Sequence, residues 1–364
     1  MSMAQADSRY LVIPQGLLHG KAARLAVARG KAIPLAGERM AFMSAWLAHR
    51  CVKTGEVSRR FLTAAQLRAQ AEGEPALAEV LARVSRPRAP FAGLDLSRPR
   101  VMGIVNVTPD SFSDGGRYLK ARAAIDHARR LAEAGADVLD VGGESTRPGA
   151  RAVSVQEELD RVMPVIEALA ADGLVVSVDT RKSAVMREAV RAGAKIVNDV
   201  SALSFDPRAR ATVARLGVPV ILMHMRGTPD TMMEQAEYDD VLWQVHDKLA
   251  AAVRAARQAG IAERNIMIDP GIGFAKRTAH NVTLTRHLAA LHGLGLALLY
   301  AASRKRFIGE ITGEPDAAAR LGGSLAVAQM ALMHGAHMVR VHDVAETAQM
   351  ARLLSACLWP EDEV

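Results

Sequence analysis

Apolar runs alternate with amphipathic, helix-like stretches from residue 101 almost to the end of the chain. Short apolar runs of this kind are typical of strands buried on both faces, as in parallel sheets. They lie near residues 101–107, 136–141, 174–178, 195–198, 218–223, 266–269, 295–299 and 337–341. Patterns rich in Ala, Leu, Arg and Glu separate them, for example over residues 121–134, 155–171, 236–259 and 344–357. Eight strand–helix units predict an α/β fold, the (β/α)8 TIM barrel.

An open, doubly wound sheet is the alternative architecture. It would need fewer strands and usually a first turn of the G-x-G-x-x-G kind, which is not found in this sequence. The polar residues favour the barrel, because they end strand after strand and a barrel brings all its strand ends to one rim. These residues are Asn106, Asp140, Asp179, Asn198, His224, Asp269, Ser303, Arg340 and His342.

The segment before the barrel has a different pattern. Two Ala-rich stretches, near residues 18–29 and 61–84, are expected to be helical and surround a short apolar patch over residues 32–42. Pro- and Arg-rich segments at 86–90 and 97–100 are typical of a linker. We therefore expect two parts: an appended module of mixed helix and short strand over residues 1–97, whose role the sequence does not reveal, and a barrel over residues 98–364.

Composition and charge narrow the function classes. The 364 residues carry a net charge of +7, and all of the excess basicity lies in residues 1–100. The basic residues there are scattered without interleaved aromatics, so a solvated surface is favoured over nucleic-acid binding. Cys51 and Cys357 lie far apart and outside any metal-ligand spacing, which is typical of a cytoplasmic protein. The sequence contains no apolar run long enough to predict a membrane span.

The stretch M-G-I-V-N-V-T-P-D-S-F-S-D-G-G, residues 102–116, predicts a functional loop. A buried strand ends at Asn106 and opens into a polar, turn-rich segment that carries Phe112 and Asp114. An amide at a strand end followed by carboxylates and a ring favours a binding site over a simple connection.

Acidic and basic groups are expected to face each other at the rim. Asp179 could cap the helix that starts near Lys182. However, the strand-end carboxylates Asp140, Asp179 and Asp269 would be gathered on one rim, where they repel one another unless a ligand or cation lies between them. Arg340 and His342 are two residues apart on one strand, so both side chains share a face and form a candidate anion site.

Residues 101–358 resemble the dihydropteroate synthase family, because eight motifs of that family occur in the family's order along the chain. They are the stretch 102–116, D-V-G-G-E-S-T-R-P-G-A (140–150), S-V-D-T (177–180), V-N-D-V (197–200), L-M-H-M-R-G-T-P (222–229), I-D-P-G-I-G-F-A-K (268–276), S-R-K-R-F-I-G (303–309) and V-R-V-H-D-V (339–344). The sequence departs from the common family pattern in two places: Ala275 stands where Gly is frequent, and Ala301-Ala302 stand where Gly-containing pairs are common. Because all three residues are small, we expect them to change the local backbone geometry in a way that the fold tolerates.

The resemblance implies condensation of 6-hydroxymethyl-7,8-dihydropterin diphosphate with 4-aminobenzoate, Mg²⁺ as cofactor, inhibition by sulfonamides and a homodimer formed through the last helices. It assigns the catalytic roles to Lys305, Asp114, Phe112, Arg340 and His342. The implied pterin site is Asp179, Asn198, Asp269, Lys305, Met225 and Phe274. The implied diphosphate site is Asn106, Arg147, Arg340 and His342, with Asn106 also on the metal, and the implied aminobenzoate site is Thr146, Pro148, Phe274 and Arg306.

Two other functions remain open from the sequence. A pterin-binding methyltransferase barrel would share Asp179, Asn198 and Asp269 but would not need the Phe112 and Thr146 loops. A non-catalytic pterin-binding paralogue is the second alternative, which the intact Lys305, Arg340 and His342 disfavour.

Overall fold

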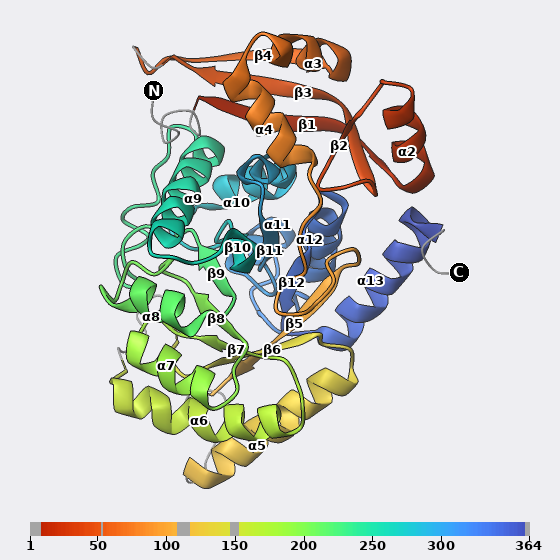
Figure 1. Ribbon diagram of the computed structural model, residues 1–364. Helices are drawn as coiled ribbons and strands as arrows, with labels where there is room; N and C mark the ends of the chain where they lie inside the picture. Colours follow the sequence, from red (N-terminus) through yellow and green to blue (C-terminus); the bar gives the residue numbers. More distant parts are fainter. Residues whose placement is uncertain (1–8, 52–53, 108–116, 146–152, 361–364) are drawn as a thin grey trace.

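The structure is a computed structural model that describes residues 9–51, 54–107, 117–145 and 153–360 (Figure 1). Its larger part is a closed barrel of eight parallel strands, which follow one another around the barrel in chain order. Met338 pairs with Arg100, so the last strand closes on the first. The strands are β5 (Arg100–Asn106), β6 (Val138–Gly142), β7 (Val176–Asp179), β8 (Ile196–Asp199), β9 (Val220–Met223), β10 (Ile266–Asp269), β11 (Ala297–Tyr300) and β12 (Met338–Val341). The predicted (β/α)8 barrel is confirmed.

Helices surround the barrel and pack on the apolar outer faces of its strands. They are α5 (Arg117–Glu133), α6 (Val155–Ala171), α7 (Ser183–Arg191), α8 (Ala209–Leu216), α9 (Val241–Gln258), α10 (Thr278–Arg286), α11 (Arg306–Thr312), α12 (Leu321–Met333) and α13 (Val344–Leu358), with 3-10 turns η2 (Glu263–Asn265) and η3 (Leu288–Leu294). The helix predicted from residue 236 begins later, at Val241, because the Asp240 side chain accepts a hydrogen bond from the Trp243 amide and caps it.

A second apolar cluster fills the barrel interior near the start of the strands. Met102, Met267 and Met338 are fully buried there. Phe91 and Leu96, from the segment predicted to be a linker, pack into the same cluster. Residues 91–96 therefore cover the amino-terminal end of the barrel, and the opposite end, where the strands finish, is left for the site.

The N-terminal module is built on an antiparallel sheet of β1 (Tyr10–His19), β2 (Ile33–Pro34), β3 (Met40–Arg50) and β4 (Val57–Thr63). Its helices are α2 (Gly20–Ala28), α3 (Ala64–Glu72) and α4 (Pro75–Ser85). The prediction of short strands was wrong for β1 and β3, which have 10 and 11 residues. The expected helix over 61–84 is interrupted, because Thr63 caps α3 and Pro75 begins α4.

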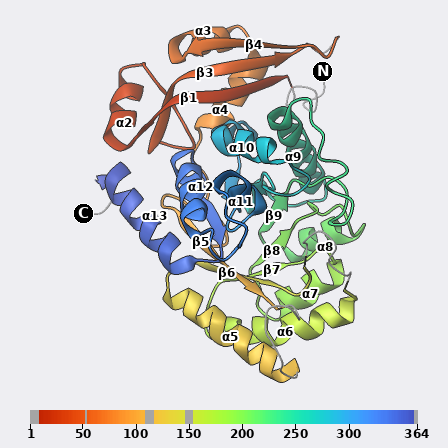
Figure 2. The same cartoon turned by 180° about the vertical axis from the view of Figure 1, so that it is seen from behind.

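Ion pairs join the module to the side of the barrel. Arg50 contacts Asp247 at 2.6 Å and covers the Trp243 ring, while Arg59 pairs with Asp240. Figure 2 shows the sheet beside α9, α10 and α12, on the side of the barrel away from α5 and α6. Part of the basic charge in residues 1–100 is therefore neutralised by barrel carboxylates. The domain boundary near residue 98 stays a prediction.

Within the described residues, no helix is both long and apolar enough to cross a membrane.

Candidate active site

The carboxyl ends of the barrel strands bring together side chains that lie far apart in sequence. Arg340, on β12, donates from Nε to Asp140 Oδ2 at 2.6 Å and from Nη2 to Asp179 Oδ2 at 2.9 Å. Asn198, on β8, donates from Nδ2 to the same Asp140 oxygen at 2.9 Å. Four strands predicted to meet at the rim, β6, β7, β8 and β12, therefore do so through one guanidinium, two carboxylates and one amide.

Asp179 does not cap the helix that follows it. Helix α7 begins at Ser183, whose amide donates to Asp206 Oδ2 at 2.9 Å. The residue before the helix, Lys182, makes no capping hydrogen bond with its side chain. Asp179 instead ends β7 and points its carboxylate at Arg340. This orientation supports a role at the rim over the capping role that the sequence left open.

Burial makes the Asp179 carboxyl a weaker acid than an ordinary aspartate side chain. Loss of solvent raises its pKa to about 7, and the neighbouring Asp140 adds to the rise, whereas Arg340 opposes it. Asp199, the next carboxylate behind the rim, has its pKa raised to about 6 by burial, although hydrogen bonds from Ser201 and Leu203 lower it. Asp179 can therefore exchange a proton near neutral pH.

Lys305 and Asp269 form the other side of the rim. Lys305 precedes α11, donates to the carbonyl of Ile272, and its ammonium lies 4.6 Å from the centre of the Phe274 ring. Burial lowers the pKa of Lys305 to about 8, and the charge of Asp269 partly offsets this. Asp269 accepts from the Gly271 amide at 2.7 Å, and burial raises its pKa. The structure thus joins Lys305, Phe274 and the 269–274 turn.

His342 and Asn106 lie at the ends of neighbouring strands. The His342 ring is 3.0 Å from Ser303 Oγ, and its own amide donates to that oxygen at 3.2 Å. Asn106 is exposed at the last position of β5. Both positions suit contact with a ligand above the barrel, because one imidazole is fixed in place and one amide faces outward.

Met225 and Arg306 occupy contrasting positions. Met225 is buried with Met223, Met232 and Ala275, and Phe274 packs on the same cluster. Arg306 pairs at 2.6 Å with Glu310 on its own helix, and 83% of its side chain is exposed. Met225 is therefore buried beside Phe274, whereas most of the Arg306 side chain is exposed to solvent.

The loop residues of the predicted site lie outside the described residues. These are Phe112, Asp114, Thr146, Arg147 and Pro148. Their assignments stay predictions.

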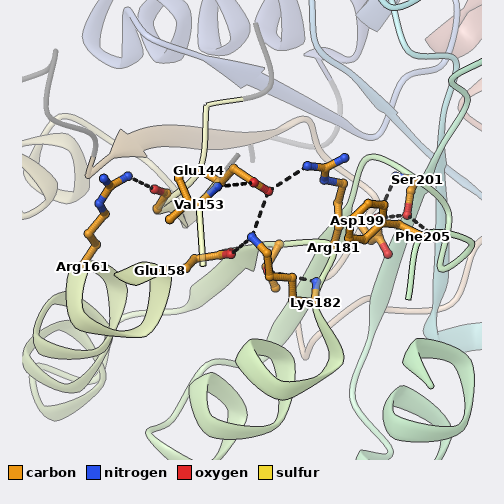
Figure 3. A network of polar contacts seen from close by, with 11 residues as sticks. Glu144, Val153, Glu158, Arg161, Arg181, Lys182, Asp199, Ser201 and Phe205 are labelled. Atoms are coloured by element: carbon orange, nitrogen blue, oxygen red, sulfur yellow. Dashed lines mark hydrogen bonds and ion pairs between the residues drawn. The ribbon is translucent and has the colours of Figure 1, made fainter. Parts of the chain in front are cut away.

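A buried ionic network borders the segment that contains three of them (Figure 3). Glu144 accepts from the Val153 amide at 3.2 Å and from Arg181 at 2.9 Å, so it connects the two described ends around residues 146–152. Lys182 pairs with Glu144 and with the fully buried Glu158. Sequence reasoning noted Asp140 as a strand-end carboxylate without giving it a role, and it missed Glu144. Both residues could have been found from the D-V-G-G-E motif, because Asp140 and Glu144 are acidic residues at the two ends of an otherwise apolar and glycine-rich stretch.

The described residues contain no group of three or more His, Cys, Asp or Glu side chains that could hold a metal ion. The exposed Asn106 offers a single amide oxygen, a donor that suits Mg²⁺ when most of the coordination comes from phosphate and water. The donor set thus fits a magnesium ion that enters with a phosphorylated substrate.

Comparison with known proteins places these features in a family. The sequence profile of a family described as pterin binding enzyme matches residues 102–342. The dihydropteroate synthase of Escherichia coli K12 is 50% identical over 266 residues, which cover 73% of this chain and 94% of that protein. The Bacillus subtilis dihydropteroate synthase is 44% identical over 259 residues, covering 71% and 88%.

Solved structures show the same relationship. Xanthomonas albilineans dihydropteroate synthase with 4-aminobenzoic acid has 54% identity and a TM-score of 0.69, covering 73% of this chain and 96% of that one. The Yersinia pestis enzyme in a sulfonamide drug complex has 47% identity and a TM-score of 0.69, covering 72% and 96%. The N-terminal module lies outside the aligned part. The chain belongs to the pterin-binding enzyme family and, within it, to the dihydropteroate synthases, which are transferases of folate synthesis.

Proposed function

We propose that the barrel condenses 6-hydroxymethyl-7,8-dihydropterin diphosphate with 4-aminobenzoate, releasing pyrophosphate and forming 7,8-dihydropteroate. The observation that carries this proposal is the meeting of Asp179, Asn198 and Arg340 at the barrel rim, around Asp140. A solved relative from Xanthomonas albilineans, 51% identical to this chain, is a complex with 7,8-dihydropteroate.

The pterin is proposed to bind across the carboxylates and the amide. A pterin edge presents parallel N–H donors, which a carboxylate such as Asp179 or Asp269 accepts, and mixed donor and acceptor atoms, which the Asn198 amide matches. Lys305 would donate to the carbonyl and ring-nitrogen side, with Met225 and Phe274 below the ring. Each charge-assisted hydrogen bond is worth roughly 1.5–3 kcal/mol, so losing one carboxylate should weaken binding at least tenfold.

The diphosphate is proposed to bind at Asn106, Arg147, Arg340 and His342. Arg340 is already paired with two carboxylates, so a diphosphate would share the guanidinium with Asp179 rather than meet a free cation. Pterin and diphosphate binding would consequently be coupled, because each changes the negative charge next to the Arg340 guanidinium. Mg²⁺, held by the diphosphate and the Asn106 oxygen, would neutralise negative charge on the leaving group.

We infer a dissociative substitution. The bond between the pterin methylene carbon and the diphosphate oxygen breaks with its electron pair going to oxygen, and the electron-rich dihydropterin ring stabilises the resulting cation. The aromatic amine then bonds to the methylene carbon and releases a proton to solvent. Catalysis would come mainly from positioning and electrostatics. The predicted roles of Phe112, Asp114, Thr146 and Pro148 are to bind aminobenzoate and keep water from the cation.

The proposal includes a homodimer formed through the last helices and a cytoplasmic location. Two exposed apolar side chains support the interface: Met330 on α12 is 42% exposed and Leu353 on α13 is 67% exposed. Pairing two such surfaces would remove apolar area from water. Light scattering of the full chain tests the dimer.

One assay separates this function from its alternatives. The protein is incubated with the pterin diphosphate, Mg²⁺ and labelled 4-aminobenzoate, and labelled dihydropteroate and pyrophosphate are measured. We expect equal amounts of the two products. Normal pterin binding without product would favour the methyltransferase barrel or a non-catalytic paralogue. A labelled sulfonamide should compete with aminobenzoate in the same assay.

A further inference from the structure

The turn after β10 has an unusual backbone. Gly271, Gly273 and Ala275 have φ angles of +67°, +81° and +50°, so three alternate residues adopt the left-handed region. A Cβ at Gly271 would collide with the carbonyl of His224, and one at Gly273 would lie 2.9 Å from Lys305 Cδ. Glycine adopts positive φ readily, so the strain in this turn lies at Ala275, and it persists because the surroundings hold that residue in place.

Lys276 supplies that support from below. The residue is 3% exposed, and its Nζ donates to Gly271 O and Phe274 O and is hydrogen-bonded to His224 Nδ1, each at 2.9 Å. Burial lowers the pKa of Lys276 well below its usual value. All three partners of Nζ are protein atoms, so the group is satisfied without any substrate contact. The two carbonyls belong to the turn, and His224 follows β9.

The same turn carries three groups of the proposed site. The Asp269 carboxylate accepts the Gly271 amide at 2.7 Å, the Ile272 carbonyl accepts from Lys305, and the Phe274 ring lies 4.6 Å from the Lys305 ammonium. The His224 amide in turn donates to the Asp269 carbonyl at 2.9 Å. Lys276 is thus hydrogen-bonded to two residues that hold Asp269 in place: Gly271, whose amide binds the Asp269 carboxylate, and His224, whose amide binds the Asp269 carbonyl.

We propose that Lys276 is a positioning residue for pterin binding: the hydrogen bonds of its Nζ fix the 269–276 turn so that Asp269, Phe274 and Lys305 present one preformed surface to the pterin ring. This inference rests on the proposed condensation and adds a residue that makes no substrate contact.

The test compares Lys276→Met with Lys276→Arg in the full chain, after circular dichroism and melting have established that each is folded. We expect Lys276→Met to raise the KM for the pterin diphosphate about 10- to 100-fold and to change kcat much less, because the reacting groups themselves are retained. Lys276→Arg should recover part of the loss. Lys248→Met is the control, an exposed lysine on α9, and should leave the pterin KM unchanged.

A second pair of variants decides the matter if Lys276→Met does not fold. His224→Leu removes one hydrogen-bond partner of Lys276 Nζ, whereas His224→Gln keeps a polar partner there. We expect a higher pterin KM in His224→Leu than in His224→Gln. A folded Lys276→Met protein with the wild-type pterin KM, or equal KM values for the two His224 variants, would overturn the proposal. Absence of condensation by the wild-type protein would instead refute the proposed function.

Discussion

The Arg340 guanidinium donates a 2.9 Å hydrogen bond to the Asp179 carboxylate, so the side chain predicted for the diphosphate is bound to the one predicted for the pterin. Asp140 accepts a second bond from the same guanidinium. One cation therefore faces two carboxylates, and burial together with the neighbouring Asp140 raises the pKa of Asp179. Substrate binding at the proposed site would change the charge around Asp179, which would make binding dependent on pH.

Pterin affinity should follow a bell-shaped pH profile. Both oxygens of Asp179 can accept two parallel N–H donors only when the carboxyl is ionised, and its pKa is about 7, so affinity rises as the pH increases through about 7. Lys305 donates best when charged, and its pKa is about 8, so affinity falls at higher pH. Calorimetric titration of the pterin diphosphate from about pH 6 to about pH 9 measures this. A flat profile across that range would contradict the assigned groups.

Asp140→Ala should destabilise the folded protein by about 3 kcal/mol or more, because breaking a buried pair leaves its partner uncompensated. Asp140 is fully buried and bonded to both Arg340 and Asn198. Urea unfolding provides the measurement. Asp126→Ala is the control: its half-exposed side chain pairs at 3.9 Å with Arg129, and the expected change is within about 0.5 kcal/mol. Equal losses in the two variants would argue against the central role of Asp140.

Asp114→Ala should slow turnover while leaving pterin binding intact. Asp114 belongs to the loop after β5 that is predicted to act with aminobenzoate rather than with the pterin. Steady-state kinetics combined with pterin calorimetry separates the two effects. Loss of pterin affinity in this variant would place Asp114 in the pterin pocket.

Ala275→Gly should leave the stability of the protein nearly unchanged. Relief of the left-handed backbone, which costs alanine about 1–2 kcal/mol, is offset by the greater chain entropy of glycine and by the loss of a buried methyl group, about 0.8 kcal/mol. Ala275 has φ +50° and is fully buried. Ala168→Gly within α6 is the comparison and should destabilise by about 1 kcal/mol. Thermal unfolding of both variants checks the difference, and an equal loss in the two would contradict the relief of strain at Ala275.

The barrel was predictable because its strands are short apolar runs that end in polar residues. All eight lie close to their predicted positions, and Asp179, Asn198 and Arg340 meet as expected. The N-terminal sheet was not predictable in the same way. Tyr10 to Pro14 are all buried, so β1 lacks the apolar–polar alternation that identifies a strand with one exposed face.

Contacts between distant residues limited the prediction of the site. Ala275 has the left-handed conformation that suits glycine, and the predicted change of backbone geometry relative to the family stays a prediction. The three hydrogen bonds of Lys276 and the double pair of Arg340 connect elements far apart in sequence. A motif locates such residues, but only the fold shows which atoms they meet.

The most direct measurement is calorimetric titration of the pterin diphosphate into the wild-type protein and into Asp179→Asn, an exchange that keeps the shape and removes the charge. We expect tight binding to the wild-type protein and loss of detectable binding to Asp179→Asn. Equal affinity in the two proteins would rule out Asp179 as the carboxylate that binds the pterin.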